Sequence, residues 1–170
     1  FQKAFFSLKN FNFSIINKII SIKKKNNLKN ILEEALNKKI SAKIVYVPHH
    51  ISHISSSYYL SGLEEAIGLT ADGSGDFSTS ESFMLENNSI KCIEKVFYPH
   101  SLGIFYQTFT QYLGFKNYGD EYKIMGLSSY GEPKYINRVK KVISYDKNGN
   151  FKLNLKYFNH HKNMISFNSD

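Results

Sequence analysis

The chain has 170 residues, 42% of them apolar, and a formal net charge of +8, which suits a single soluble domain or part of a larger one. No uncharged apolar run approaches the roughly eighteen residues of a membrane-spanning helix, and Arg138 is the single arginine, so neither a membrane nor a nucleic-acid partner is expected. Cys92 is the single cysteine, which excludes an internal disulfide framework and favours a reducing, cytoplasmic compartment.

Hydrophobic periodicity predicts the first elements in chain order. Two helices are expected, over residues 5–22 and over Leu28 to Lys39, with a polar loop between them. A short β-branched run from Ala42 to Val47 predicts a buried strand, which Pro48 ends. The following stretch, His49 to Leu60, predicts a third helix.

The middle of the chain has the alternation of β-strands. A strand is predicted from Glu65 to Ala71, and it closes on a glycine-rich turn from Asp72 to Asp76. Two further strands, Phe77 to Leu85 and Ile90 to Val96, flank a hairpin turn at residues 86–89. Cys92 lies in the last of these strands and is expected to be a small, buried or half-buried residue.

The remaining elements are mostly helical. Helices are predicted over Ser101 to Leu113, with the serine as N-cap, and over Asp120 to Leu127. Residues 132–143 are amphipathic in the manner of a helix, and a turn at Asn148 to Asn150 leads into a strand over residues 151–155. This order predicts a layered α/β domain with meander-like strands and not an all-parallel sheet.

The most distinctive pattern is the group of three histidines, His49, His50 and His53. On a helix, His49 and His53 lie one turn apart on one face, where two imidazoles can share a metal ion. A carboxylate from the glycine-rich turn could complete a mixed nitrogen and oxygen site for iron, zinc or manganese. His50 can also pair with His53 at three-residue spacing, so the residues alone leave the ligand pair open.

Two other stretches each have a functional and a plain interpretation. Amides in the turn at residues 72–76 could hold phosphate oxygens, but Asp-Gly also favours an ordinary hairpin turn. The glycine-bracketed segment at residues 119–133 could hold an anion or nucleotide at a helix start near Lys123. Its alternative is a capped surface helix with Glu121 and Lys123 in solvent.

Four stretches of the sequence occur together in one order, and together they resemble a known family. They are residues 48–57, 70–76, 101–106 and 119–133. The set resembles the N-terminal part of the O-carbamoyltransferases of the nodulation-protein U and tobramycin carbamoyltransferase type. The best-matched region is 45–135, and its most specific part is the Glu-Tyr-Lys-x-Met-Gly-Leu run that begins at Glu121.

The resemblance implies a fold and an activity. The fold is an α/β, actin-like and Hsp70-like ATPase (Kae1-like) fold, of which residues 1–170 are expected to be a partial N-terminal domain. The activity is carbamoyl transfer from carbamoyl phosphate, through a carbamoyl adenylate formed with ATP, to a hydroxyl group of a small-molecule acceptor. As a fragment, the chain is expected to be inactive alone, because a further metal aspartate of the family lies beyond its last residue.

The resemblance also implies a set of site residues. A divalent metal, Fe²⁺ in the first instance, is expected on His49, His53 and Asp72, with His50 as a neighbour. The nucleotide ATP is expected near Gly73, Gly75, Glu121 and Lys123. These expectations concern binding, and the resemblance assigns no catalytic side chain.

Two other functions are considered. One is tRNA threonylcarbamoyl transfer of the Kae1 type, which the Glu-Tyr-Lys-x-Met-Gly-Leu run and the scarcity of arginine argue against. The other is a non-catalytic module that binds a metal or a nucleotide. A downstream metal aspartate and a domain that makes carbamoyl adenylate would favour the transferase over both.

Overall fold

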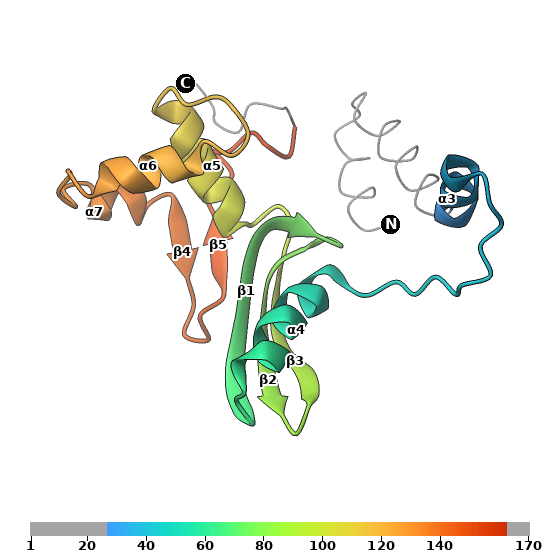
Figure 1. The fold of residues 1–170 in the computed structure, drawn as a ribbon. Helices are drawn as coiled ribbons and strands as arrows, with labels where there is room; N and C mark the ends of the chain where they lie inside the picture. Colours follow the sequence, from blue (N-terminus) through green and yellow to red (C-terminus); the bar gives the residue numbers. More distant parts are fainter. Residues whose placement is uncertain (1–26, 163–170) are drawn as a thin grey trace. The chain divides into compact units, whose positions relative to one another are not determined.

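The computed structural model describes residues 27–162 (Figure 1). The chain divides into two compact units, and the boundary along the sequence lies between Val47 and Pro48. In the first unit, helix α3 runs from Leu28 to Leu36 and ends at Asn37, whose φ of 47° is left-handed. A left-handed residue is a common helix end, and it stops this predicted helix three residues early. The helix predicted over residues 5–22 lies outside the described residues.

The strand predicted from Ala42 to Val47 is wrong. The backbone there is irregular, and the side chains of Val45 and Val47 are 68% and 56% exposed. β-branched residues favour strands only where a neighbouring strand supplies hydrogen bonds and packing. The described part of the first unit contains no such strand, so the local preference has no partner.

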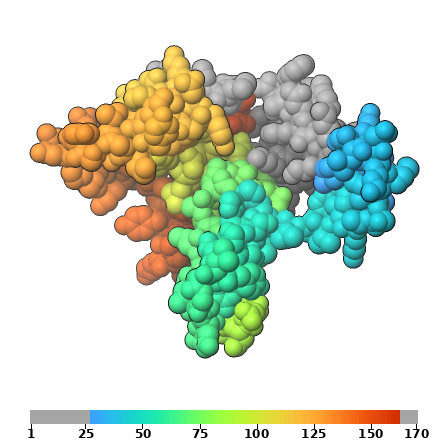
Figure 2. Space-filling model, viewed as in Figure 1, coloured from blue at the N-terminus to red at the C-terminus, as the bar shows by residue number. Residues whose placement is uncertain are grey.

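The second unit is built on an antiparallel meander and one covering helix. Strands β1 (Glu65–Gly75), β2 (Ser78–Glu86) and β3 (Ser89–Phe97) form a sheet in the order β1-β2-β3. Helix α4 (His49–Ser61) lies across one face of this sheet, as the teal surface over the green strands shows (Figures 1 and 2). The predicted helix and three predicted strands are therefore confirmed, as is the meander.

The core of this unit lies between α4 and β2. Ile54 and Tyr58 of the helix pack with Phe83 and Leu85 of the strand, and all four side chains are buried. The helical pair is four residues apart and the strand pair is two apart, so each pair points to one side of its element. Gly68 of β1 has no side chain where Ile54 approaches, which brings the helix close to the sheet.

The chain reverses later than predicted between β1 and β2. Strand β1 continues through Asp72 to Gly75, although its pairing with β2 is interrupted between Ala71 and Gly75. The turn itself consists of Asp76 and Phe77, whose φ values are 49° and 85°. Two consecutive left-handed residues match the right-handed twist of a hairpin, so the glycine-rich stretch is a bulged strand end.

The helices after the meander were predicted correctly. Helix α5 (Leu102–Tyr112) is capped by Ser101, whose hydroxyl accepts a hydrogen bond from the amide of Ile104 at 3.0 Å. Helix α6 (Glu121–Ser128) follows. Within residues 27–162, no helix combines the length and apolar character that crossing a bilayer would need.

The helix expected over residues 132–143 is mostly wrong. Only the single turn α7 (Ile136–Val139) forms there, and β4 (Ile143–Tyr145) then pairs antiparallel with β5 (Phe151–Leu153). The pairing partner of Ile143 is Leu153, ten positions along the chain, so local periodicity does not reveal this strand. The described chain is thus a mixed α/β structure with two small antiparallel sheets.

Candidate metal centre

Three side chains converge where α4 begins and β1 ends. His49 and His53 lie on successive turns of α4, and their Nε2 atoms are 3.0 Å apart. Asp72, near the end of β1, places Oδ2 at 2.5 Å from Nε2 of His49 and at 3.4 Å from Nε2 of His53. The three donor atoms therefore surround one point, and each side chain is partly open to solvent.

The spacing of these donors fits a metal ion. Bonds of about 2.1 Å to one ion separate neighbouring donors by roughly 3.0 Å in octahedral and 3.4 Å in tetrahedral geometry. The His49–His53 and His53–Asp72 distances agree with that range, and the shorter His49–Asp72 distance is that of a direct hydrogen bond. Two imidazoles and a carboxylate suit a borderline divalent ion, with further coordination positions left open.

Asp72 is held as an anion. Burial raises the pKa of its carboxyl group, but hydrogen bonds with His49 and with the amide of Gly73 outweigh that effect, and the pKa is lowered. The Gly73 amide donates to Oδ1 at 2.5 Å, which leaves Oδ2 directed at the two histidines. An ionised carboxylate with one oxygen held in place is a suitable metal ligand.

The backbone of Asp72 is held by the start of α5. The Ser101 hydroxyl donates to the carbonyl oxygen of Asp72 at 2.8 Å, and Ser101 is fully buried. Gly103 lies so close that a Cβ there would be 2.6 Å from the amide nitrogen of Gly73 and 2.8 Å from the carbonyl carbon of Asp72. Sequence reasoning identified Ser101 only as a cap and missed this second contact, which depends on how α5 lies against β1.

His50 points in another direction from its two neighbours. Its side chain is 1% exposed, and its Nδ1 lies 2.8 Å from the hydroxyl oxygen of Thr70 on β1. The Thr70 hydroxyl in turn donates to the carbonyl oxygen of Glu81 at 3.2 Å. In this arrangement His50 connects helix and sheet, while His49 and His53 share the cluster with Asp72.

The four residues expected near a nucleotide lie in two places. Gly73 and Gly75 are in the bulged end of β1, where Gly73 has open space beside it and Gly75 is buried against the His49 ring. Glu121 and Lys123 are on α6, where the Lys123 ammonium is 2.7 Å from the Asp120 carboxylate. Within residues 27–162, no hydrogen bond or ion pair joins Glu121 or Lys123 to the histidine cluster.

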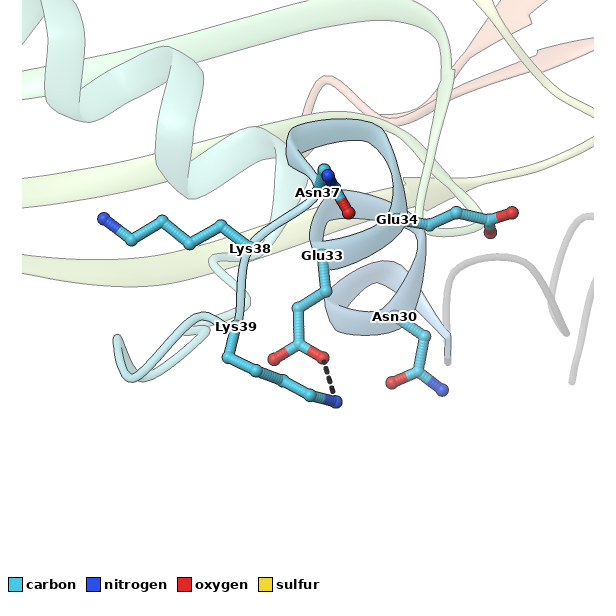
Figure 3. A pocket seen from close by; sticks show the side chains of 6 residues that line it. All are labelled: Asn30, Glu33, Glu34, Asn37, Lys38 and Lys39. Carbon is cyan, nitrogen blue, oxygen red and sulfur yellow. Dashed lines mark hydrogen bonds and ion pairs between the residues drawn. The ribbon is translucent and has the colours of Figure 1, made fainter.

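A hollow in the first unit offers no comparable chemistry. It lies beside the end of α3 and is lined by polar side chains (Figure 3), namely Asn30, Glu33, Glu34, Asn37, Lys38 and Lys39. Glu33 is already engaged there, by Lys39 at 3.3 Å and by the amide of Ile40 at 2.9 Å. The candidate site is therefore the cluster of the second unit.

The sequence is similar to a known protein family and to several curated proteins. A family model for the N-terminus of carbamoyltransferases matches residues 3–169. An uncharacterized protein of Synechocystis is 37% identical over 140 residues, which is 78% of this chain and 23% of that protein. The match to the nodulation protein NolNO of Sinorhizobium fredii is 38% identical over 92 residues, 54% of this chain and 13% of that protein.

A relative from an archaeon matches a similar share of the chain. An uncharacterized protein of Methanocaldococcus jannaschii is 35% identical over 129 residues, 76% of this chain and 23% of that protein. The chain thus spans less than a quarter of the length of each of these three relatives.

Proposed function

This chain belongs to the carbamoyltransferase family, whose N-terminal region it matches over nearly its whole length, and on that premise we propose that the protein transfers a carbamoyl group to an acceptor hydroxyl. The proposed donor is carbamoyl phosphate, which ATP converts to carbamoyl adenylate. The observation that carries the proposal is the convergence of His49, His53 and Asp72. Carbamoyl transfer needs a site that holds and polarises the carbamoyl carbonyl group, which is the electrophile of the reaction.

In this proposal the three side chains hold a divalent ion, Fe²⁺ in the first instance. When bound, such an ion supplies Lewis acidity that polarises a carbonyl group. His49 and His53 contribute nitrogen donors on a rigid helix face, and Asp72 contributes the negative charge. The partial exposure of all three supports access by a small substrate.

The nucleotide is assigned to the two stretches named from the sequence. The open space beside Gly73 allows a phosphate to approach the backbone, and Gly75 leaves room for the His49 ring. Glu121 and Lys123 lie in the first turn of α6, where an ammonium group favours an anion. Lys123 has three donor hydrogens, so its contact with Asp120 leaves others available for a phosphate.

The proposal extends to the fold. We assign the second unit to part of an actin-like, Hsp70-like (Kae1-like) fold, because an antiparallel meander followed by a helix is compatible with the start of such a half-domain. The acceptor is a small molecule with a hydroxyl group.

The test combines metal content with turnover in the whole protein. Carbamoylation of candidate hydroxyl acceptors is measured with carbamoyl phosphate, ATP and Fe²⁺. We expect His49→Ala, His53→Ala and Asp72→Asn each to lower metal affinity by about tenfold or more, and turnover with it. His50→Asn is the matched control, because an asparagine amide can replace Nδ1 beside Thr70.

Each outcome has a distinct meaning. Metal loss in His50→Asn with retention in His49→Ala would contradict the ligand assignment. Metal binding without carbamoylation of any acceptor would favour the non-catalytic module. Transfer of a threonylcarbamoyl group to an adenosine of tRNA would favour the second enzyme class.

A further inference from the structure

The first residue of α4 is itself a candidate metal ligand. His49 begins the helix, and the amides of a helix's first turn have no partner within the helix. The preceding residue, Pro48, occupies the capping position and has no side-chain acceptor for these amides. Helix ends fray, so the position of the His49 ring depends on an acceptor from elsewhere in the fold.

That acceptor comes from the turn between β1 and β2. Oδ2 of Asp76 accepts a hydrogen bond from the backbone amide of His49 at 2.8 Å, across 27 positions of the sequence. The turn brings the carboxylate there because Asp76 and Phe77 both have left-handed backbones, with φ values of 49° and 85°. A carboxylate at a helix N-terminus also interacts favourably with the helix dipole.

The same turn also supports the ring of His49. Gly75, next to Asp76, is buried, and a Cβ at this position would overlap the His49 ring. The backbone amide and the imidazole of one residue are therefore both in contact with the end of the hairpin. Asp72 belongs to the same strand end, so the hairpin carries one proposed ligand and supports another.

We propose that Asp76 is a positioning residue of the metal centre, which fixes the start of α4 so that the His49 imidazole faces Asp72. The inference rests on the proposed metal site. Asp76 is then a fourth side chain of the centre. It does not bind the metal and acts through the backbone amide of His49.

The experiment separates the acceptor from the backbone conformation. Asp76→Gly and Asp76→Asn both tolerate a left-handed φ, but only asparagine retains an oxygen that can accept the His49 amide. Asn87→Gly is the control, because Asn87 also has a φ of 49° and lies in the turn between β2 and β3, at the other end of the sheet. Co²⁺ is titrated into the whole protein and its d–d absorption bands are recorded, with far-ultraviolet circular dichroism to verify folding.

We expect Asp76→Gly to weaken Co²⁺ binding by about fivefold, the effect of losing one helix cap, and to alter the positions or intensities of the absorption bands. Asp76→Asn should restore the affinity and spectrum of the unmodified protein, and Asn87→Gly should leave both unchanged. A purely structural role would lower stability in Asp76→Gly without altering the cobalt spectrum.

The failures are distinguishable. Absence of Co²⁺ binding in the unmodified protein would refute the metal site of the proposed function. Normal binding with an unchanged affinity and spectrum in Asp76→Gly would overturn the positioning role of Asp76. If Asp76→Gly does not fold, Asp76→Asn decides: an unchanged spectrum supports the hydrogen-bonding role, and an altered spectrum overturns it.

Discussion

Replacing Ser101 by alanine should destabilise the second unit by about 2 kcal/mol. The hydroxyl is fully buried and makes two hydrogen bonds, one from the Ile104 amide at 3.0 Å and one to the Asp72 carbonyl at 2.8 Å. Loss of the helix cap costs about 1 kcal/mol, and loss of the second bond costs about as much. The second bond lies where the pairing of β1 with β2 is interrupted, so no ladder bond replaces it.

The free energy of unfolding is measured by urea titration with circular dichroism. Ser129→Ala is the control, because this exposed hydroxyl also donates to a backbone carbonyl, that of Gly126 at 2.8 Å, and its loss should cost less than about 0.5 kcal/mol. A Ser101→Ala variant within about 0.5 kcal/mol of the unmodified protein would refute the reasoning. Equal losses in the two serine variants would do so as well.

Two glycine substitutions and one carboxylate give further predictions. Gly103→Ala should lower the free energy of unfolding by about 1–3 kcal/mol, because the added Cβ would lie 2.6 Å from the Gly73 amide nitrogen. Gly126→Ala on α6 has open space and should raise the free energy of unfolding by up to about 1 kcal/mol. Thermal unfolding checks both variants, and equal shifts of their melting temperatures would contradict the packing argument. Burial raises the pKa of Glu81, but hydrogen bonds from a serine hydroxyl and from Lys95 outweigh burial, so the pKa is lowered. The stability from this carboxylate is present above its unfolded pKa of about 4 and is lost as pH falls through the lower folded pKa. In acid titrations below about pH 4, Glu81→Gln should therefore lose stability less steeply than the unmodified protein. An equally steep loss in Glu81→Gln would show that other groups cause it.

Much of the second unit was predictable from local patterns. The helix from His49 and the hairpin around Asn87 follow from composition and spacing over a few residues, and the structure contains both. The Ser101 cap is likewise a local signal, because a serine before an apolar periodic run satisfies amides of the same helix. In each case the partner groups lie within a few residues of one another, so the sequence contains the whole interaction.

The errors occur where the partner is distant. The run from Ala42 to Val47 has strand composition but no neighbouring strand in the described residues, and Ile143 forms a strand because Leu153 returns beside it. The glycine-rich stretch from Asp72 to Asp76 was expected to be the turn, but the chain reverses at Asp76 and Phe77. Pairing between strands is a non-local interaction. The β-propensity of a short run of residues only makes such pairing more or less favourable once a partner strand is present.

The candidate metal centre shows the same division. The sequence by itself determined that His49 and His53 share a helix face, since four residues make about one turn. The family resemblance named Asp72 as their partner. Only the tertiary structure decided how Asp72 meets them, that His50 turns toward Thr70, and that Asp76 binds the helix start. Those contacts depend on how α4 lies across β1, which the burial of apolar side chains from separate elements sets and no short stretch of sequence contains.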